Sequence, residues 1–208
     1  FKKEFKKEVV DYFLKQTKYF GRRQELYGSS HENVRFALFD LACLNLLKLI
    51  NFKPDIVQCH DWHSGLTPFF LQKEPFVSDP FYQGVATVFT IHNLAFQFGH
   101  NWWEVPEEAM DDGRSLLPSF AAASFENINF VKRGILHASL INTVSEKYAQ
   151  EILTPEQGQG LHRLLQNHRD RLFGIVNGVD YGDYNPATDK NLFANYDARD
   201  LSGKKANK

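Results

Sequence analysis

The sequence predicts an α/β fold, a Rossmann-like parallel sheet with flanking helices. Two observations predict it. Short apolar runs that follow turn residues alternate with segments whose apolar residues recur at helical spacing, a pattern typical of βαβ units. Four such runs occur, at residues 56–59, 85–91, 139–143 and 172–176. Polar residues directly follow each run, at the strand ends where parallel sheets bind ligands.

Helical spacing predicts four helices around these strands. The first is an amphipathic helix at residues 2–20, and its apolar residues are Phe5, Val9, Tyr12 and Phe13. The second spans residues 32–50, and its predicted buried residues are Phe36, Leu38, Phe39, Ala42, Leu46 and Leu49. Two more helices begin after Ser64 and after Ser145. Residues 98–128 lack regular spacing and predict a lid or binding loop.

The composition excludes several classes of protein. With 208 residues, of which 43% are hydrophobic, the chain can bury a core. Its 24 basic and 25 acidic residues give a net charge of −1, which does not favour nucleic acid or a membrane as partner. No apolar run approaches the roughly 18 residues of a membrane span. Cys43 and Cys59 lie in apolar runs, which predicts buried thiols rather than a disulfide.

The first polar cluster reads His-Asp-Trp-His, and three interpretations of it remain open. His60 and His63, with His92 as a third ligand, would form the zinc site of a metal-dependent hydrolase. Asp61 would instead cap the helix that follows. In the third interpretation the Asp61 carboxylate faces a sugar hydroxyl or a developing positive charge, and Trp62 packs against the apolar face of the sugar.

The other polar clusters follow the later strands. They are His92-Asn93, Thr143 with Ser145, and Asn177, which precedes a glycine and is also typical of a simple turn. Because the carboxyl ends of parallel strands meet at one edge of the sheet, we expect these clusters to lie together. This arrangement predicts an active site without reference to any family.

Four segments in this order resemble the bacterial and plant glycogen/starch synthases. They lie between residues 53 and 189 and read KPDIVQCHDWHSGLTPFFL, VFTIHNLAFQ, INTVSEKYAQEILTPEQGQGL and RLFGIVNGVDYGDYNPATD. Each motif alone has modest specificity, whereas the ordered set is highly specific. The resemblance implies a GT-B glycosyltransferase of family 5. Such an enzyme has two Rossmann-like domains with the active site between them.

The resemblance also implies a reaction. Glucose would pass from a nucleotide-glucose, usually ADP-glucose, to an α-1,4-glucan (glycogen or starch), with retained configuration and with neither cofactor nor metal. Asp61 would lie near the reacting centre and His92 would contact the donor glucose, which makes these two residues the predicted catalytic pair. Trp62, Asn93 and Asn177 would bind substrate. Neither catalytic residue would be a covalent nucleophile, and alanine at either is expected to lower turnover with little change in thermal stability.

The resemblance sets the expected extent of the domain. Residues 1–185 would form part of the N-terminal catalytic domain, and residues 186–208 would lead to a C-terminal nucleotide-binding domain outside this chain. We therefore expect the chain alone to be inactive. We expect the protein to be located in a bacterial cytoplasm or a plastid. Two alternatives remain: a non-catalytic glucan-binding or regulatory module with the same fold, and the metal-dependent hydrolase described above.

Overall fold

The computed structural model describes residues 2–6, 9–21, 24–28 and 31–208. The chain divides into two compact units, Phe1–Ile175 and Val176–Lys208. The first unit contains a parallel sheet and its helices, and the second contains turns and one short helix, α6 (Ser202–Ala206). In the described part of the chain, no helix has the length and hydrophobicity needed to cross a membrane.

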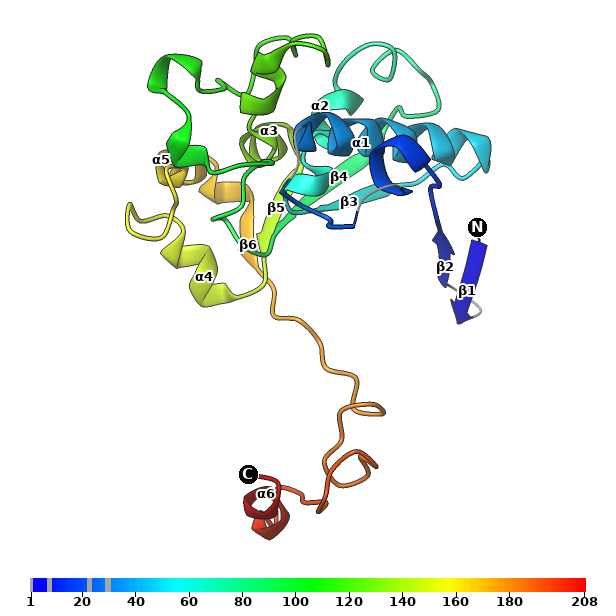
Figure 1. Ribbon diagram of the computed structural model, residues 1–208, viewed down its shortest axis with the longest axis vertical. Helices are drawn as coiled ribbons and strands as arrows, with labels where there is room; N and C mark the ends of the chain where they lie inside the picture. Colours follow the sequence, from blue (N-terminus) through cyan, green and yellow to red (C-terminus); the bar gives the residue numbers. More distant parts are fainter. Residues whose placement is uncertain (1, 7–8, 22–23, 29–30) are drawn as a thin grey trace. The chain divides into compact units, whose positions relative to one another are not determined.

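Four parallel strands form the sheet of the first unit (Figure 1), which confirms the predicted fold class. They are β3 (Ile56–His60), β4 (Ala86–Ile91), β5 (Leu140–Thr143) and β6 (Leu172–Gly174). The strands lie in this order across the sheet. The register pairs His60 with Thr90 and Ile91 with Thr143, so the carboxyl ends of the strands share one edge.

Helices cover one face of this sheet. Figure 1 shows α1 (Glu32–Leu49), α2 (Thr67–Leu71) and α3 (Phe130–His137) grouped on the same side. A Cβ added at Gly134 of α3 would lie 2.7 Å from the Phe89 ring of β4, so glycine lets the helix pack directly on the strand. The remaining helices are α4 (Glu146–Glu151) and α5 (His162–Gln166), together with short 3₁₀ turns at Trp62–Ser64, Trp102–Glu104, Glu107–Ala109, Ala123–Asn127 and Arg169–Arg171.

Successive strand residues point to opposite faces of the sheet, and these two faces differ in exposure. Phe89 and Ile141, which are paired in the register, are fully buried. On the opposite face Ile56, Leu140 and Phe173 are 60%, 44% and 50% exposed. Polar residues also cross this second face. Gln58 donates to the Thr90 hydroxyl at 3.0 Å, and Thr90 donates to Asn142 Oδ1 at 2.6 Å.

The predicted helix at residues 2–20 is wrong. Antiparallel strands β1 (Lys2–Lys6) and β2 (Val9–Tyr12) occupy this region, followed by a π-helical turn at Thr17–Gly21. Val and Tyr are enriched in strands. Pairing of the two strands satisfies their main-chain hydrogen bonds, and it does not require an apolar helix face to be buried against the domain. Consistent with this, Tyr12 and Phe13 are 43% and 56% exposed.

The helix predicted at residues 32–50 is confirmed as α1, but one of its predicted core residues is wrong. Phe36 is buried, whereas Leu49 is 82% exposed. Leu49 lies five residues after the buried Leu44, which turns it about 140° around the helix axis from the packed side. The four other predicted residues, Leu38, Phe39, Ala42 and Leu46, are half-buried.

Buried polar side chains anchor the irregular connection at residues 98–128. Asn33 of α1 is fully buried, and its Nδ2 donates to the carbonyls of Phe125 and Ile128, both at 3.0 Å. Its Oδ1 accepts the Gly99 N–H at 2.9 Å. One amide group therefore closes both ends of the connection onto α1.

A buried ion pair holds the middle of the same connection. Arg133 of α3 donates to both carboxylate oxygens of Asp111, from Nε at 2.9 Å and from Nη2 at 2.7 Å. Its Nη1 donates to the Ser115 carbonyl at 2.9 Å. Both charged side chains are at most 3% exposed, so opening the segment would leave unpaired buried charges. This anchoring argues against a lid at residues 111–115.

Asp40 of α1 is a buried carboxyl group beside the two cysteines. Its Oδ2 accepts the Leu66 N–H at 3.0 Å, and burial raises its pKa well above the usual range. Burial and then Asp40 raise the pKa of the Cys43 thiol to about 12, and the same two causes raise the pKa of Cys59. Both cysteines are free; Cys59 is buried and Cys43 is half-buried.

We predict that Asp40→Asn flattens the pH dependence of stability. The pKa of Asp40 is raised in the folded state. Its contribution to the free energy of unfolding is therefore fully present below the unfolded-state pKa of 3.8, and it is lost as the pH rises through the folded-state pKa. Asparagine keeps an oxygen for the Leu66 N–H but does not titrate. The free energy of urea unfolding, measured from pH 4 to pH 8, should fall less with pH in the variant. Equal slopes would contradict the prediction.

Candidate active site

The site begins where β3 ends, at a residue in an unusual main-chain conformation. Asp61 has φ 53° and ψ −171°, a region that residues other than glycine rarely adopt. Its N–H donates to the Thr90 carbonyl at 2.9 Å, which fixes it beside β4. Such strain persists only where the surroundings hold it, and it is concentrated at functional sites.

The Asp61 side chain joins the ends of two strands. Its Oδ1 accepts the N–H of His92 at 2.8 Å and the N–H of Asn93 at 3.4 Å. Asp61 makes no side-chain bond to the helical turn that follows it. The helix-cap interpretation of Asp61 is therefore wrong, because the carboxylate reaches across the sheet to the main chain after β4.

The imidazoles of His60 and His92 are in direct contact. His60 Nδ1 and His92 Nε2 lie 2.9 Å apart, and the ring centroids are separated by 5.2 Å. Ser64 fixes the main chain of His60, since its hydroxyl accepts the His60 N–H at 2.6 Å and donates to the His60 carbonyl at 2.9 Å. Burial, and then the neighbouring His92, lower the pKa of His60, while Asp61 opposes this shift.

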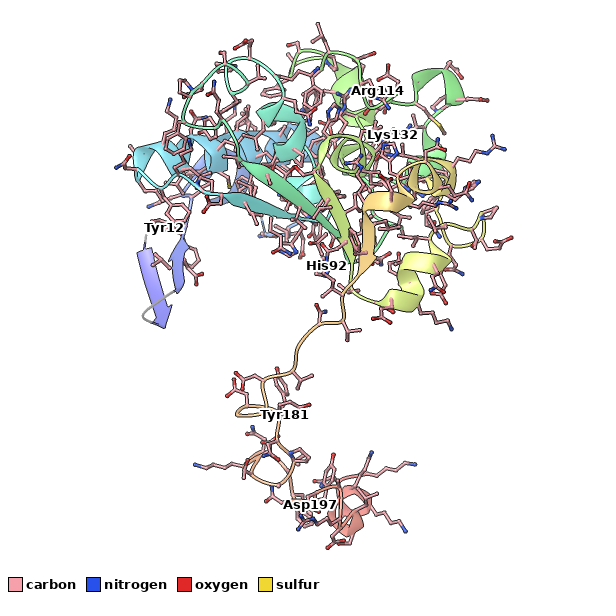
Figure 2. All side chains as sticks on the ribbon, turned by 180° about the vertical axis from the view of Figure 1, so that it is seen from behind. Tyr12, His92, Arg114, Lys132, Tyr181 and Asp197 are labelled. Atoms are coloured by element: carbon pink, nitrogen blue, oxygen red, sulfur yellow. The ribbon has the colours of Figure 1, made fainter. Side chains whose placement is uncertain are left out.

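An open pocket of about 370 Å³ lies beside His92. Figure 2 shows His92 at the edge of the sheet, well away from Lys132 and Arg114. The lining residues are His92, Asn93, Ala95, Val144, Tyr148, Gln157 and Gln159. They supply imidazole, amide and hydroxyl groups but no carboxylate, ammonium or guanidinium group. The pocket is thus suited to a neutral ligand rich in hydroxyl groups.

The sequence predictions missed Tyr148, Gln157 and Gln159. The hydroxyl of Tyr148 accepts the Leu94 N–H at 3.1 Å and so supports the His92 loop from α4. Burial raises the pKa of this phenol. The glycines that flank Gln159 in the sequence were the only available signal, because alternating glycines indicate an unusual loop conformation.

Trp62 and His63 turn away from the pocket. Trp62 is 4% exposed, and its ring packs on Phe36 with a centroid distance of 4.7 Å. The core covers this ring in the structure, and the contact of Trp62 with a sugar stays a prediction. His63 Nε2 lies 2.8 Å from the Tyr27 hydroxyl. The three histidines of the zinc interpretation do not converge, and no group of three His, Cys, Asp or Glu among the described residues is placed to hold a metal.

The other polar strand ends have structural uses or lie elsewhere. Thr143 is fully buried and donates to the Ile91 carbonyl at 2.8 Å. Ser145 caps α4 by accepting the Tyr148 N–H at 3.3 Å. Asn177 is exposed and belongs to the second unit, so its role in substrate binding stays a prediction. The first unit therefore brings together His60, Asp61, His92 and Asn93.

We predict that Asp61 is needed for stability as well as for the site. Asp61→Ala removes the acceptor of the exposed His92 N–H, and losing a hydrogen bond of this kind costs about 0.5–1.5 kcal/mol. Asp61→Asn keeps an acceptor oxygen and tolerates positive φ better than most residues. Thermal unfolding should therefore show a clear loss for alanine and little change for asparagine. This differs from the small effect of Asp61→Ala expected from the sequence, and equal melting temperatures for wild type and alanine would restore that expectation.

We predict that the pKa of His60 reports its contact with His92. His92→Gln removes the ionisable neighbour and keeps a polar side chain. The pKa of His60 should then rise toward its usual value without reaching it, because burial is the larger cause of the shift. NMR titration of the His60 ring protons measures this change. An unchanged titration would show that the two imidazoles do not interact.

Comparison with known proteins shows which family this chain is similar to. A family model described as the starch synthase catalytic domain matches residues 1–167. Glycogen synthase 2 of Geobacter sulfurreducens is 42% identical over 204 residues, which are 96% of this chain and 42% of that protein. The glycogen synthase of Ligilactobacillus salivarius is 44% identical over 196 residues, 94% of this chain and 40% of that protein. The chain spans about two fifths of the length of these curated relatives.

A solved structure shows the same fold. The catalytic domain of starch synthase IV from Arabidopsis thaliana, bound to ADP and acarbose, aligns with a TM-score of 0.70 and 32% sequence identity. The alignment covers 91% of this chain and 38% of that one. The sequence motifs, the parallel sheet and both comparisons agree, and this chain belongs to the starch synthase catalytic domain family.

Proposed function

We propose that this chain is part of a retaining glucosyltransferase, which moves glucose from ADP-glucose to the non-reducing end of an α-1,4-glucan. Membership of the family and the names of the glycogen synthase relatives support this reaction. The related structure is described as bound to ADP and acarbose, which supports a nucleotide and a glucan-like ligand. Because the chain spans about two fifths of its relatives, we expect transfer to require their remaining length.

One observation carries the proposal. Asp61 ties the His92 main chain to the end of β3, and His92 stands at the edge of a neutral, hydrogen-bonding pocket. A glucosyl group is neutral and carries several hydroxyls, which imidazole and amide groups recognise well. The net charge of −1 fits a neutral polysaccharide better than a nucleic acid.

The proposed roles follow from the contacts. His92 would hold the donor glucosyl group and stabilise positive charge that develops at its reacting carbon. Asp61 would position His92 and add a negative charge close to the reacting centre. Asn93 would contact the sugar from the same loop, and Asn177 is proposed to bind substrate as the sequence motif implies. We propose no covalent nucleophile, no required metal and no cofactor.

The compartment is part of the same proposal. The two glycogen synthases named above are bacterial and are 42% and 44% identical to this chain, against 32% for the plant enzyme, which favours a bacterial cytoplasm over a plastid. A non-catalytic glucan-binding module would share the fold, but no feature of the described residues favours it. The activity measurement below separates the two functions.

We predict that His92→Ala lowers the turnover number about 10²- to 10³-fold, the usual loss when a group that stabilises the transition state is removed. Glucose transfer from ADP-glucose to glycogen is measured with the natural gene product that carries these residues. His100→Ala is the matched control, because His100 is exposed and lies outside the pocket lining. Activity should persist when a chelator is present.

Two outcomes would contradict the proposal. Full turnover in His92→Ala would remove His92 from the mechanism. Glucan binding without any transfer by the wild-type gene product would favour the non-catalytic module.

A further inference from the structure

Two glutamines on the segment between α4 and α5 line the pocket beside His92. This segment, residues 154–161, is the glutamine loop and reads Thr-Pro-Glu-Gln-Gly-Gln-Gly-Leu. The Gly158 N–H donates to the Thr154 carbonyl at 2.8 Å. A Cβ at Gly158 would lie 2.7 Å from the Ile152 carbonyl oxygen, so only glycine fits here. The loop therefore has a defined shape.

A buried chain of amides fixes the second glutamine. Gln159 has φ 47°, in the left-handed region that glycine prefers. Its carbonyl accepts from Gln97 Nε2 at 2.7 Å, and Gln97 Oε1 accepts from Asn129 Nδ2 at 2.6 Å. Gln97 is 1% exposed. The interior of the domain thus holds the strained main chain of Gln159 in place.

The side chains of Gln157 and Gln159 remain available to a ligand. Both line the pocket, and among the described residues neither amide has a hydrogen-bond partner in the protein. Each amide offers two N–H donors and one carbonyl oxygen, a set that matches neighbouring hydroxyls on a sugar ring. No ammonium or guanidinium group lines the pocket, which disfavours a phosphate there.

We infer that Gln157 and Gln159 form a subsite for a neutral glucosyl unit, next to the one that His92 contacts. This inference rests on the proposed function and assigns the glutamine loop a part in it. The pocket volume of about 370 Å³ lies within the range of small-ligand sites. The glucosyl unit belongs either to the acceptor glucan or to ADP-glucose, and both present the same hydroxyl chemistry.

The test measures binding of maltotriose and of ADP-glucose, separately, by calorimetry on the natural gene product. Gln157→Ala removes the first amide. Gln159→Gly removes the second and also relieves the positive φ, so it adds no backbone strain to the loop. Gln150→Ala is the matched control, because Gln150 is exposed on α4 outside the pocket.

We expect each pocket variant to weaken one ligand about three- to tenfold, the effect of losing a neutral hydrogen bond, and the control to bind normally. Weaker maltotriose binding assigns the subsite to the acceptor, and weaker ADP-glucose binding assigns it to the donor. Unchanged binding of both ligands by both variants overturns the inference while the proposed function stands. If the wild type neither binds these ligands nor transfers glucose, the proposed function fails and the inference fails with it.

Discussion

The contact between Asp61 Oδ1 and the His92 N–H is the interaction on which the site depends. Parallel strands bring their carboxyl ends to one edge, but they do not by themselves fix the loops that leave it. The Asp61 carboxylate does so by reaching from the end of β3 to the main chain after β4. Its strained conformation is the local cost of that reach, and the bond from its N–H to Thr90 helps to maintain it.

Buried polar side chains also fix irregular segments elsewhere in the first unit. Asn33 closes a long connection onto α1, Arg133 pairs with Asp111, and Gln97 holds the main chain of Gln159. Each is almost fully buried, so each needs its partners and loses much if they move. These contacts fix the irregular segments to the rest of the unit, and a pocket made of loops is thereby given a defined shape.

Much of this arrangement was predictable from the sequence. Apolar runs located the four strands, and the polar residues after them located Asp61 and His92 at one sheet edge. The failures have a common cause. The burial of Trp62 and the strained loop at Gln159 depend on contacts between distant segments, which leave no periodic pattern in the chain. The antiparallel pair of β1 and β2 shows the converse, where spacing suggested a helix but strand pairing prevailed.

The two thiols give the folded chain a chemical property of its own. Only the thiolate attacks alkylating reagents, and burial keeps Cys43 and Cys59 protonated at neutral pH. Cys43 lies on α1 and Cys59 on β3, so they share the interface between helix and sheet. Cys59 is the buried one of the two, so a thiol reagent would modify it only as fast as this layer separates. The rate at which Cys59 is modified would therefore report how often the core opens.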